Sequence, residues 1–434
     1  MEIHTQDTVK TTEGMVLAHL KMLGEYKRTL EKIIQNERYI APESALKAPF
    51  DEDLLKDAQE VADTYKKEVK TVILVGIGGQ LRGVRALYSA LRGHADTLCS
   101  ASPKLLTYST VEPEMLNDVE EIFESHENAN EIVLIVSSKS GTTTETITNA
   151  NVIFNKFSKH FDEEVATKQT VVISDDNSPL AESAREKGIT VLTFPEEIGG
   201  RYSVFTPAGT LPLMLLGFNV GSFLEGARTA IETSTTEGKP SSAGVIAAFL
   251  FEAYLQGSRI HELFIWNPEL EMLGKWYRQL LAESIGKERG DGTRLGFTPT
   301  ISIGSNDLHS VGQLIFGGRN DRFTTFVGAP NEWNGGDKYK KDSPFTLPGL
   351  EGKKTGDVIR SIYEGVQNTY KHDELPFISI ELTEINEREI GAFMALNMAV
   401  IMYLAQLFDV DAFDQPAVER YKNEVRSILS KKEM

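Results

Sequence analysis

Short apolar runs alternate with helical patterns through most of this 434-residue chain, and this alternation constrains the fold more than any other feature. Each run has the length and the β-branched composition of a buried strand. Strands that alternate with helices form parallel sheets that carry helices on both faces. In the first half of the chain, the candidate strands are residues 71–75, 104–110, 131–136, 170–174 and 189–194.

The same pattern recurs in the second half of the chain. Its candidate strands are residues 261–266, 298–304, 323–328 and 377–382. Because a chain of this length exceeds a typical single domain, the two sets of strands predict two α/β domains. The predicted segments are an N-terminal helical arm (1–68), a first domain (69–215), a second domain (216–410) and a C-terminal helix (411–434).

Four further stretches of the second half have a clear pattern. Residues 245–257 and 387–407 read as apolar helices, and Pro416 stands near the first turn of the terminal helix, where proline is favoured. Residues 330–356 form a polar, Gly- and Lys-rich insertion. We expect this insertion to lie outside the core.

Charge and cysteine content exclude several classes of protein. Lysine and arginine number 45 and the acidic residues 63, so the net charge is 45 − 63 = −18. This balance argues against a nucleic-acid or anionic-membrane partner. Cys99 is the only cysteine, so no intrachain disulfide forms, and the start has no apolar signal segment. With no apolar run near the ~20 residues of a membrane span, we expect a cytoplasmic protein.

The stretch "SSKSGTTTET" (137–146) follows the strand at 131–136 and precedes a helical pattern. In parallel α/β sheets, ligands bind at the carboxyl ends of strands, where the first N–H groups of the next helix are unpaired. The hydroxyls of Ser138, Ser140, Thr143 and Thr146, together with the charge of Lys139, suit a phosphate group. A plain helix cap would need one hydroxyl, and four exceed it, so we predict a phosphate-binding loop.

The stretch "VGIGGQLRG" (75–83) also follows a strand and opens a helix. It fails the dinucleotide pattern, because Leu81 stands at the third glycine position and no acidic residue ends the next strand. Two interpretations stay open. The glycines permit either the close approach of a small ligand or a tight turn between strand and helix.

Three other residues have chemistry suited to catalysis. Arg201 follows two glycines and offers a planar fork of donors for a phosphate or an oxyanion. Glu283 lies four residues after Gln279, on the same side of a predicted helix, and is a candidate base. His309 follows a strand and is a candidate proton shuttle. The eight histidines include no H-x-H or H-x-x-x-H pair, so no metal-ligand set is visible.

Six blocks of the sequence resemble, in order, the signature blocks of the glucose-6-phosphate isomerase family. They are "GIGG", "SKSGTTTET", "GGRYSV", "QLLAESIGK", "DLHSVGQL" and "FDQPAVERYK", within about residues 70 to 425. The resemblance implies two sugar-isomerase (SIS) domains, each a parallel sheet flanked by helices. It also implies reversible conversion of glucose 6-phosphate to fructose 6-phosphate through an enediolate, without metal or cofactor.

The resemblance also implies roles for individual residues. Glu283 matches the base that carries a proton between C1 and C2, His309 the histidine that assists ring opening, and Arg201 the arginine that stabilises the enediolate. Lys422 matches a lysine close to the ring oxygen. The positions that match substrate contacts are Gly78, Gly79, Gln80, Ser138, Lys139, Ser140, Thr143, Thr146, Gly200, Gln279 and Gln415. Family members are commonly homodimers, so His309 is expected to act in the neighbouring subunit's site.

Three positions depart from the family pattern. Gln80 stands where serine is expected, Ile285 where asparagine is frequent, and Tyr421 where glycine is common. Three alternatives therefore stay open. A bifunctional phosphoglucose/phosphomannose isomerase would share the fold and the base. A glucosamine-6-phosphate synthase-type module would need an N-terminal cysteine, whereas the sequence starts Met1-Glu2. A non-catalytic sugar-phosphate sensor would have no need of a base.

Overall fold

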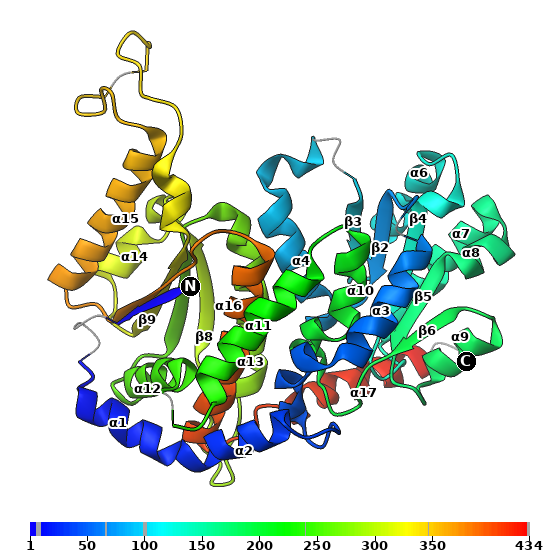
Figure 1. Cartoon of the computed structure of the whole chain (residues 1–434), viewed down its shortest axis with the longest axis horizontal. Coiled ribbons are helices and arrows are strands. Elements are labelled where there is room, and N and C mark those ends of the chain that lie inside the picture. Colours follow the sequence, from blue (N-terminus) through cyan, green and yellow to red (C-terminus); the bar gives the residue numbers. More distant parts are fainter. Residues whose placement is uncertain (6–9, 66, 99–101, 239, 346, 432–434) are drawn as a thin grey trace.

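The computed structural model describes residues 1–5, 10–65, 67–98, 102–238, 240–345 and 347–431. Each of its two lobes is built around a five-stranded sheet, and helices pack between the lobes and on their outer faces (Figure 1). All nine predicted strands are present. The predicted fold class, parallel sheets flanked by helices, is confirmed.

The first sheet is entirely parallel and has the strand order β3-β2-β4-β5-β6. Its strands are β2 (Thr71–Val75), β3 (Lys104–Tyr108), β4 (Ile132–Ser137), β5 (Thr170–Ser174) and β6 (Thr190–Thr193). The order reverses between β2 and β4, because β3 lies on one side of β2 and the later strands lie on the other. Ligands of such sheets bind at the carboxyl ends of the strands at this switch point.

The second sheet has the order β1-β10-β9-β7-β8. Its strands are β7 (Ile260–Ile265), β8 (Thr298–Ile303), β9 (Arg322–Gly328), β10 (Phe377–Glu381) and β1 (Glu2–Thr5). Strand β1 pairs antiparallel with β10, so the segment predicted as a helical arm begins with an edge strand instead. Four residues with a mostly exposed pattern carry too little periodicity to reveal a strand in the sequence.

Helices cover both sheets. Those of the N-terminal segment and the first lobe are α1 (Glu13–Met22), α2 (Gly24–Ile34), α3 (Glu52–Tyr65), α4 (Gly79–Arg92), α5 (Pro113–Asn117), α6 (Val119–Glu124), α7 (Thr144–Phe161), α8 (Glu163–Lys168), α9 (Pro179–Glu186) and α10 (Pro207–Leu215). The remaining helices are α11 (Val220–Thr235), α12 (Ser242–Leu255), α13 (Glu271–Ile285), α14 (Gly312–Gly317), α15 (Thr355–His372), α16 (Glu387–Phe408) and α17 (Pro416–Lys431).

One continuous apolar core joins the two lobes. Residues from the inner faces of both sheets, such as Val72 and Ile265, belong to it together with nearly all of α16. Separate clusters around Phe123 and Phe326 cover the outer faces of the two sheets. Because the inner core is shared, the lobes are packed against each other and the loops between them are held in register.

Helix α16 is long and apolar enough to cross a membrane, with a mean hydropathy of 1.8, which corrects the expectation that no such run exists. However, 94% of its most apolar window is buried inside the protein. It packs against α11, α12 and α13 in the second lobe (Figure 1). The helix therefore serves as the central element of the core.

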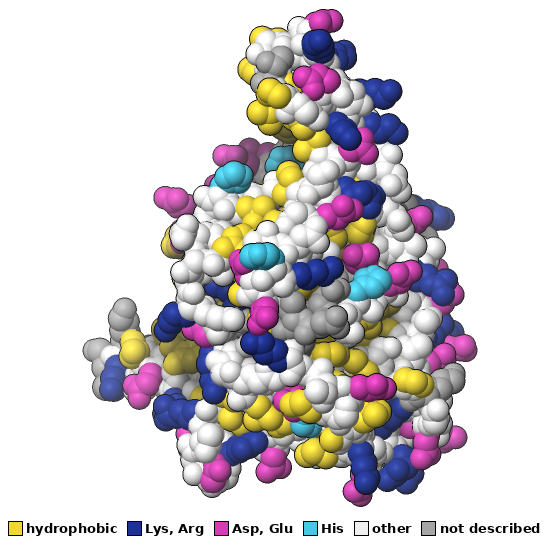
Figure 2. Space-filling view, turned by 90° about the vertical axis from the view of Figure 1, so that its left-hand side faces the viewer, with side chains coloured by type: hydrophobic (Ala, Val, Ile, Leu, Met, Phe, Trp, Pro, Cys, Tyr) yellow, Lys and Arg dark blue, Asp and Glu magenta, His cyan; other side chains and the backbone are white. Residues whose placement is uncertain are grey.

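The polar insertion lies outside the core, as expected. It forms the projection at the top of Figure 1, which extends from the second lobe. Figure 2 shows lysine or arginine side chains on this projection beside acidic and apolar ones. Phe345 and Leu347 are exposed there (83% and 60%). Trp333, in the 3₁₀ turn Pro330–Asn334 that starts the insertion, is buried and packs against Tyr363 of α15.

Candidate functional site

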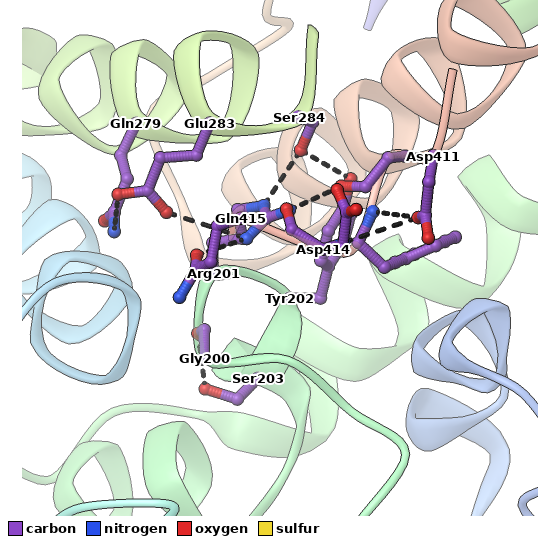
Figure 3. A network of polar contacts seen from close by, with 12 residues as sticks. Gly200, Arg201, Tyr202, Ser203, Gln279, Glu283, Ser284, Asp411, Asp414 and Gln415 are labelled. Carbon is purple, nitrogen blue, oxygen red and sulfur yellow. Dashed lines mark hydrogen bonds and ion pairs between the residues drawn. The ribbon is translucent and has the colours of Figure 1, made fainter. Parts of the chain in front are cut away.

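Arg201 is the centre of a polar network that joins residues distant in the sequence (Figure 3). It lies in a 3₁₀ turn, Gly200–Phe205, and is 5% exposed. Its Nε donates to Ser284 Oγ (2.9 Å) and its Nη1 to Gln415 Oε1 (2.9 Å). Its Nη2 donates to the carbonyl oxygens of Ala412 (2.5 Å) and Asp414 (3.2 Å).

These bonds occupy four of the five N–H groups of the guanidinium. The Nη1 atom, which carries the remaining one, lies 3.6 Å from Glu283 Oε2. Arg201 is therefore a fixed cation whose only uncommitted donor lies on the side of the predicted base. Such a charge needs no reorganisation when negative charge develops beside it.

Glu283 and Gln279 lie one turn apart on α13, as their spacing predicts, and Gln279 Nε2 donates to Glu283 Oε1 (3.2 Å). The side chain of Glu283 is 34% exposed, so a ligand can reach the carboxylate. Gln279 Oε1 is buried and has no partner among the described residues. It is thus a free acceptor next to the carboxylate.

The segment between α16 and α17 is held from two sides. Besides the bonds of Arg201, Lys287 Nζ donates to the carbonyl oxygen of Asp414 and forms an ion pair with its carboxylate (2.6 Å). Tyr202, which is fully buried, packs on Phe413 and bonds Ser284 Oγ through its hydroxyl (2.9 Å). The start of α17 is therefore anchored at the site.

The glycine-rich loop after β2 packs directly on this network. A Cβ at Gly79 would lie 2.2 Å from the carbonyl oxygen of Gly200, and a Cβ at Gly78 would lie 2.8 Å from Gln279 Nε2. Of the two open interpretations, the tight turn agrees with the φ of +64° at Gly78, and the close approach of a small ligand stays a prediction. The groups that approach these glycines are the chain's own backbone at Gly200 and the amide of Gln279.

The predicted phosphate loop joins β4 to α7, at the switch point of the first sheet. Thr143 is the N-cap of α7, and its side chain makes no capping hydrogen bond. The first intrahelical bond is donated by Ile147 to the carbonyl of Thr143 (3.0 Å). The N–H groups of the three preceding residues therefore have no intrahelical partner and can bind an anion.

Hydroxyls surround this helix terminus. Thr146 is 1% exposed, and its Oγ1 has no partner in the part of the chain that the structure describes. Ser138 is equally buried and donates to Thr143 Oγ1 (3.1 Å). Ser140 is exposed, and its Oγ accepts from the N–H of Thr142 (3.3 Å). A buried hydroxyl without a partner is costly, and Thr146 carries one at this helix terminus.

Gly141 and Lys139 fix the turn of the loop. Gly141 has φ +65°, and a Cβ there would lie 2.9 Å from the backbone nitrogen of Leu180, so a side chain would be both strained and obstructed. Lys139 Nζ donates to the carbonyl oxygen of Glu196. The ammonium is therefore held at the rim of the loop.

Asp175 lies directly behind the loop, and its N–H donates to the carbonyl oxygen of Lys139 (3.1 Å). Burial raises the pKa of the Asp175 carboxyl to about 6, while the nearby charge of Lys139 opposes the shift. It also lines a cleft of about 600 Å³ together with Ser140 and Glu196.

Gln80, on the first turn of α4, is 7% exposed. In the orientation that pairs both ends of its amide, Nε2 donates to the carbonyl oxygen of Ser137 (3.0 Å) and Oε1 accepts from the N–H of Lys139 (2.9 Å). This amide therefore bonds the phosphate loop.

Arg82 of α4 lies near Glu283, and Arg85 of α4 and Arg278 of α13 lie near Arg82. None of the three has an ion-pair or hydrogen-bond partner among the described residues. Arg82 Nε is buried and unpaired within that part of the chain. Burial lowers the Arg82 pKa, and the charges of the other two arginines add to the shift. They form a local positive surface in an acidic protein.

The structure does not bring His309 and Lys422 to Glu283. His309 ends the 3₁₀ turn Asn306–His309 after β8 and is exposed. Lys422 Nζ donates to Glu419 Oε1 (2.7 Å) on its own helix, and none of the described residues of α17 is buried. Their predicted roles remain predictions.

Sequence reasoning missed Ser284, which accepts from Arg201, and Lys287, which holds Asp414. Ser284 and Lys287 stand beside Glu283 in the block "QLLAESIGK", and this adjacency was their only signal. The backbone carbonyl groups of Ala412 and Asp414 carry no signal in a sequence.

Comparison with known proteins adds independent evidence. The family model of phosphoglucose isomerase matches residues 5–434. A glucose-6-phosphate isomerase of Methanocaldococcus jannaschii is 28% identical over 84% of this chain and 86% of its own, and one of Mesoplasma florum is 29% identical over 88% of each. A solved structure of a hypothetical protein from Thermus thermophilus is 25% identical, with a TM-score of 0.84 over 99% of both chains. A glucose-6-phosphate isomerase structure from Chlamydia trachomatis has a TM-score of 0.74 at 16% identity, covering 97% of this chain and 84% of its own.

Proposed function

The chain belongs to the phosphoglucose isomerase family, and on that premise we propose that the network around Arg201 and Glu283 is its active site. The protein interconverts glucose 6-phosphate and fructose 6-phosphate, the reaction for which its relatives are named. The observation that carries the proposed site is the 3.6 Å approach of Arg201 Nη1 to Glu283 Oε2, at a guanidinium whose other donors are occupied.

The aldose and the ketose differ by two hydrogens, one that moves from C2 to C1 and one that moves from the oxygen on C2 to the oxygen on C1, and by the oxidation state of the two carbons. Glu283 removes the proton from C2 of the open-chain aldose, and the electron pair moves to give an enediolate. The same carboxyl then returns the proton to C1, while the hydroxyl proton of O2 passes to O1. A base of this kind contributes on the order of 10²–10⁴ in rate, and Arg201 supports the negative charge that forms on the oxygens.

The phosphate of the substrate binds at the uncapped N-terminus of α7. It would accept from the free N–H groups of the first turn and from the hydroxyl of Thr146, which lacks a partner among the described residues. Binding at this end holds C1 and C2 at Glu283, since remote binding energy positions the reacting atoms. Gln279 Oε1, also without a partner in that part of the chain, would accept from a sugar hydroxyl.

His309 and Lys422 complete the proposal. Because His309 is exposed, and because no hydrogen bond or ion pair joins it to Glu283 among the described residues, we assign it to the site of a second subunit in a homodimer. Lys422 would exchange its present partner, Glu419, for the substrate near the ring oxygen. A cytoplasmic location is part of the same proposal, and the net charge of −18 and the single cysteine support it.

The test of the base is conversion of fructose 6-phosphate, coupled to NADP-linked oxidation of glucose 6-phosphate, with EDTA present. Glu283→Gln should lower kcat by at least about 10²-fold. Glu288→Gln is the matched control, because this carboxylate lies nearby but pairs with Arg294 at the surface. Equal losses in both variants would remove Glu283 from the mechanism.

The test of the dimer mixes two inactive variants. A heterodimer of Glu283→Gln and His309→Ala subunits contains one site with both native residues only if His309 acts in trans. Recovery of activity on mixing after partial dissociation supports this assignment. Absence of recovery, with heterodimers confirmed by native mass spectrometry, would place His309 in the site of its own chain.

A further inference from the structure

Gln80 occupies the position where the resembling family has serine, and its side chain lies at the switch point of the first sheet. Strands β2 and β4 are parallel neighbours, so the loop that follows β2 and the loop that follows β4 emerge side by side. The amide of Gln80, on the first turn of α4, crosses from one loop to the other. It is buried where it does so.

Both ends of this amide bond the backbone of the phosphate loop. The donor end bonds the carbonyl oxygen of Ser137 (3.0 Å), the last residue of β4, and the acceptor end bonds the N–H of Lys139 (2.9 Å). The amide thus fixes the peptide groups on either side of Ser138. A serine side chain is two bonds shorter than that of glutamine and has a single polar atom, so it cannot make this pair of bonds.

The bond to Lys139 has a consequence for anion binding. Because the N–H of Lys139 is occupied by Gln80, it is not a donor for the phosphate. The donors that remain are the N–H groups of the first turn of α7 and the hydroxyls around them, including that of Thr146. Their relative positions depend on the path of residues 137–139, which Gln80 fixes.

We propose that Gln80 is a positioning residue that holds the phosphate loop in its anion-binding shape, instead of contacting the sugar phosphate itself. This inference rests on the proposed function of the loop. A loop held in the bound conformation before the ligand arrives loses less conformational entropy on binding. The effect of Gln80 should therefore be on substrate affinity, and the chemistry at Glu283 should be unaffected.

The second sheet contains a comparable bond at its own switch point. The side chain of Asn267, after β7, accepts from the N–H of Ala329, after β9 (2.8 Å), and is 5% exposed. Buried amides thus join the neighbouring loops in both lobes. Of these two buried amides, the amide of Gln80 bonds a loop that is followed by unpaired N–H donors, and an anion needs such donors.

The test replaces Gln80 by methionine, which keeps the length and approximate volume of the side chain but removes both hydrogen bonds. For Gln80→Met, the KM for fructose 6-phosphate should rise about tenfold, as expected for two bonds lost from a binding loop, with kcat within a factor of two. The inhibition constant of inorganic phosphate should rise in parallel. Gln80→Asn, one methylene shorter, should behave in the same way.

Ala90→Gly on the same helix is the control for a general loss of stability, since it weakens α4 far from the loop. It should leave KM unchanged. A fall in kcat at constant KM in Gln80→Met would overturn the proposal and place Gln80 at the reacting carbons. Unchanged KM and phosphate inhibition would overturn it as well.

Phosphate binding by calorimetry separates this proposal from the proposed function. If the wild type lacked isomerase activity, a weaker phosphate affinity in Gln80→Met than in Ala90→Gly would still support the positioning role. Equal affinities would reject it. Should Gln80→Met fail to fold, Gln80→Asn provides the same comparison.

Discussion

Arg201 Nη1 lies 3.6 Å from Glu283 Oε2, while Nε of the same guanidinium donates to Ser284, the next residue of α13 (Figure 3). The remaining donors hold the segment that leads into α17. The side chain of Arg201 thus joins the helix of the proposed base to the terminal helix, and its backbone packs on the glycine-rich loop. Small displacements of any of these elements should be transmitted to the others.

Arg201→Lys is expected to lower kcat by about 10²-fold, because an ammonium keeps the charge but cannot reproduce the planar set of bonds. Amide hydrogen exchange in residues 411–431 should become faster, since one of the two anchors of this segment is lost and only the contacts of Lys287 with Asp414 remain. Arg228→Lys is the control, because Arg228 also donates to a backbone carbonyl but lies elsewhere. Exchange in Arg201→Lys that is as slow as in the wild type would contradict the anchoring role.

Arg82, which lies near Glu283, and its neighbours Arg85 and Arg278 have no partners among the described residues and should attract the dianionic substrate. We expect kcat/KM for fructose 6-phosphate to fall several-fold as ionic strength rises from about 0.02 to 0.2 M. The double variant Arg82→Gln/Arg278→Gln should show a flatter dependence. Arg319→Gln removes an arginine that is 86% exposed and paired with Asp321, and it should leave the slope unchanged. Parallel slopes for all three proteins would exclude steering by this cluster.

Asp175 should make the protein less stable at neutral pH than at mildly acidic pH. Its pKa is about 6 in the folded protein against an ordinary value of 3.8, so the native state binds the proton more tightly. The cost of ionisation is therefore present above pH 6 and disappears as the pH falls toward 4. Asp175→Asn should raise the Tm at pH 7.5, with a difference that shrinks at pH 4.5.

Asp176→Asn is the matched control for this measurement, because Asp176 is exposed and pairs with Arg185. It should show no gain in Tm at either pH. A pH-independent gain in Asp175→Asn would mean that the amide improves packing and that ionisation is irrelevant.

His261 should have the opposite effect on stability. It is buried in β7, where Tyr277 and Thr325 bond its two ring nitrogens (2.9 Å each), and burial lowers its pKa to about 3. Between pH 6.5 and 3 the unfolded state binds a proton that the native state does not. Stability is then lost by up to about 1.4 kcal/mol per pH unit as the pH falls.

His261→Gln should therefore flatten the dependence of the unfolding free energy on pH between 6.5 and 4, measured by urea denaturation. His372→Gln serves as the control, since His372 has an 87% exposed side chain. If the slopes of wild type and His261→Gln coincide, His261 is not the group that titrates.

The local pattern of apolar and polar residues was sufficient to predict most of the strands and helices. Each predicted strand is a short apolar run that can be recognised in the sequence without knowledge of its partners. The helices at 245–257 and 387–407 were predicted in the same way, from their apolar residues. Strand β1 escaped prediction because its evidence lies in its partner, β10, at the other end of the chain. Pairing between distant segments depends on tertiary packing, which periodicity does not encode.

Some features of the candidate site were also predictable from the sequence, and others required the tertiary structure. Residue order was enough to establish that a hydroxyl-rich loop follows a buried strand, and that Gln279 and Glu283 share a helix face, because both depend on spacing within one element. Three-dimensional packing was needed to establish that Arg201 bonds Ser284 and the segment before α17, and that Gln80 bonds the phosphate loop. These bonds join elements that are distant in the sequence and that the shared core brings together. The partners of a side chain in such a contact depend on how the elements pack, and the spacing of residues within one element does not determine them.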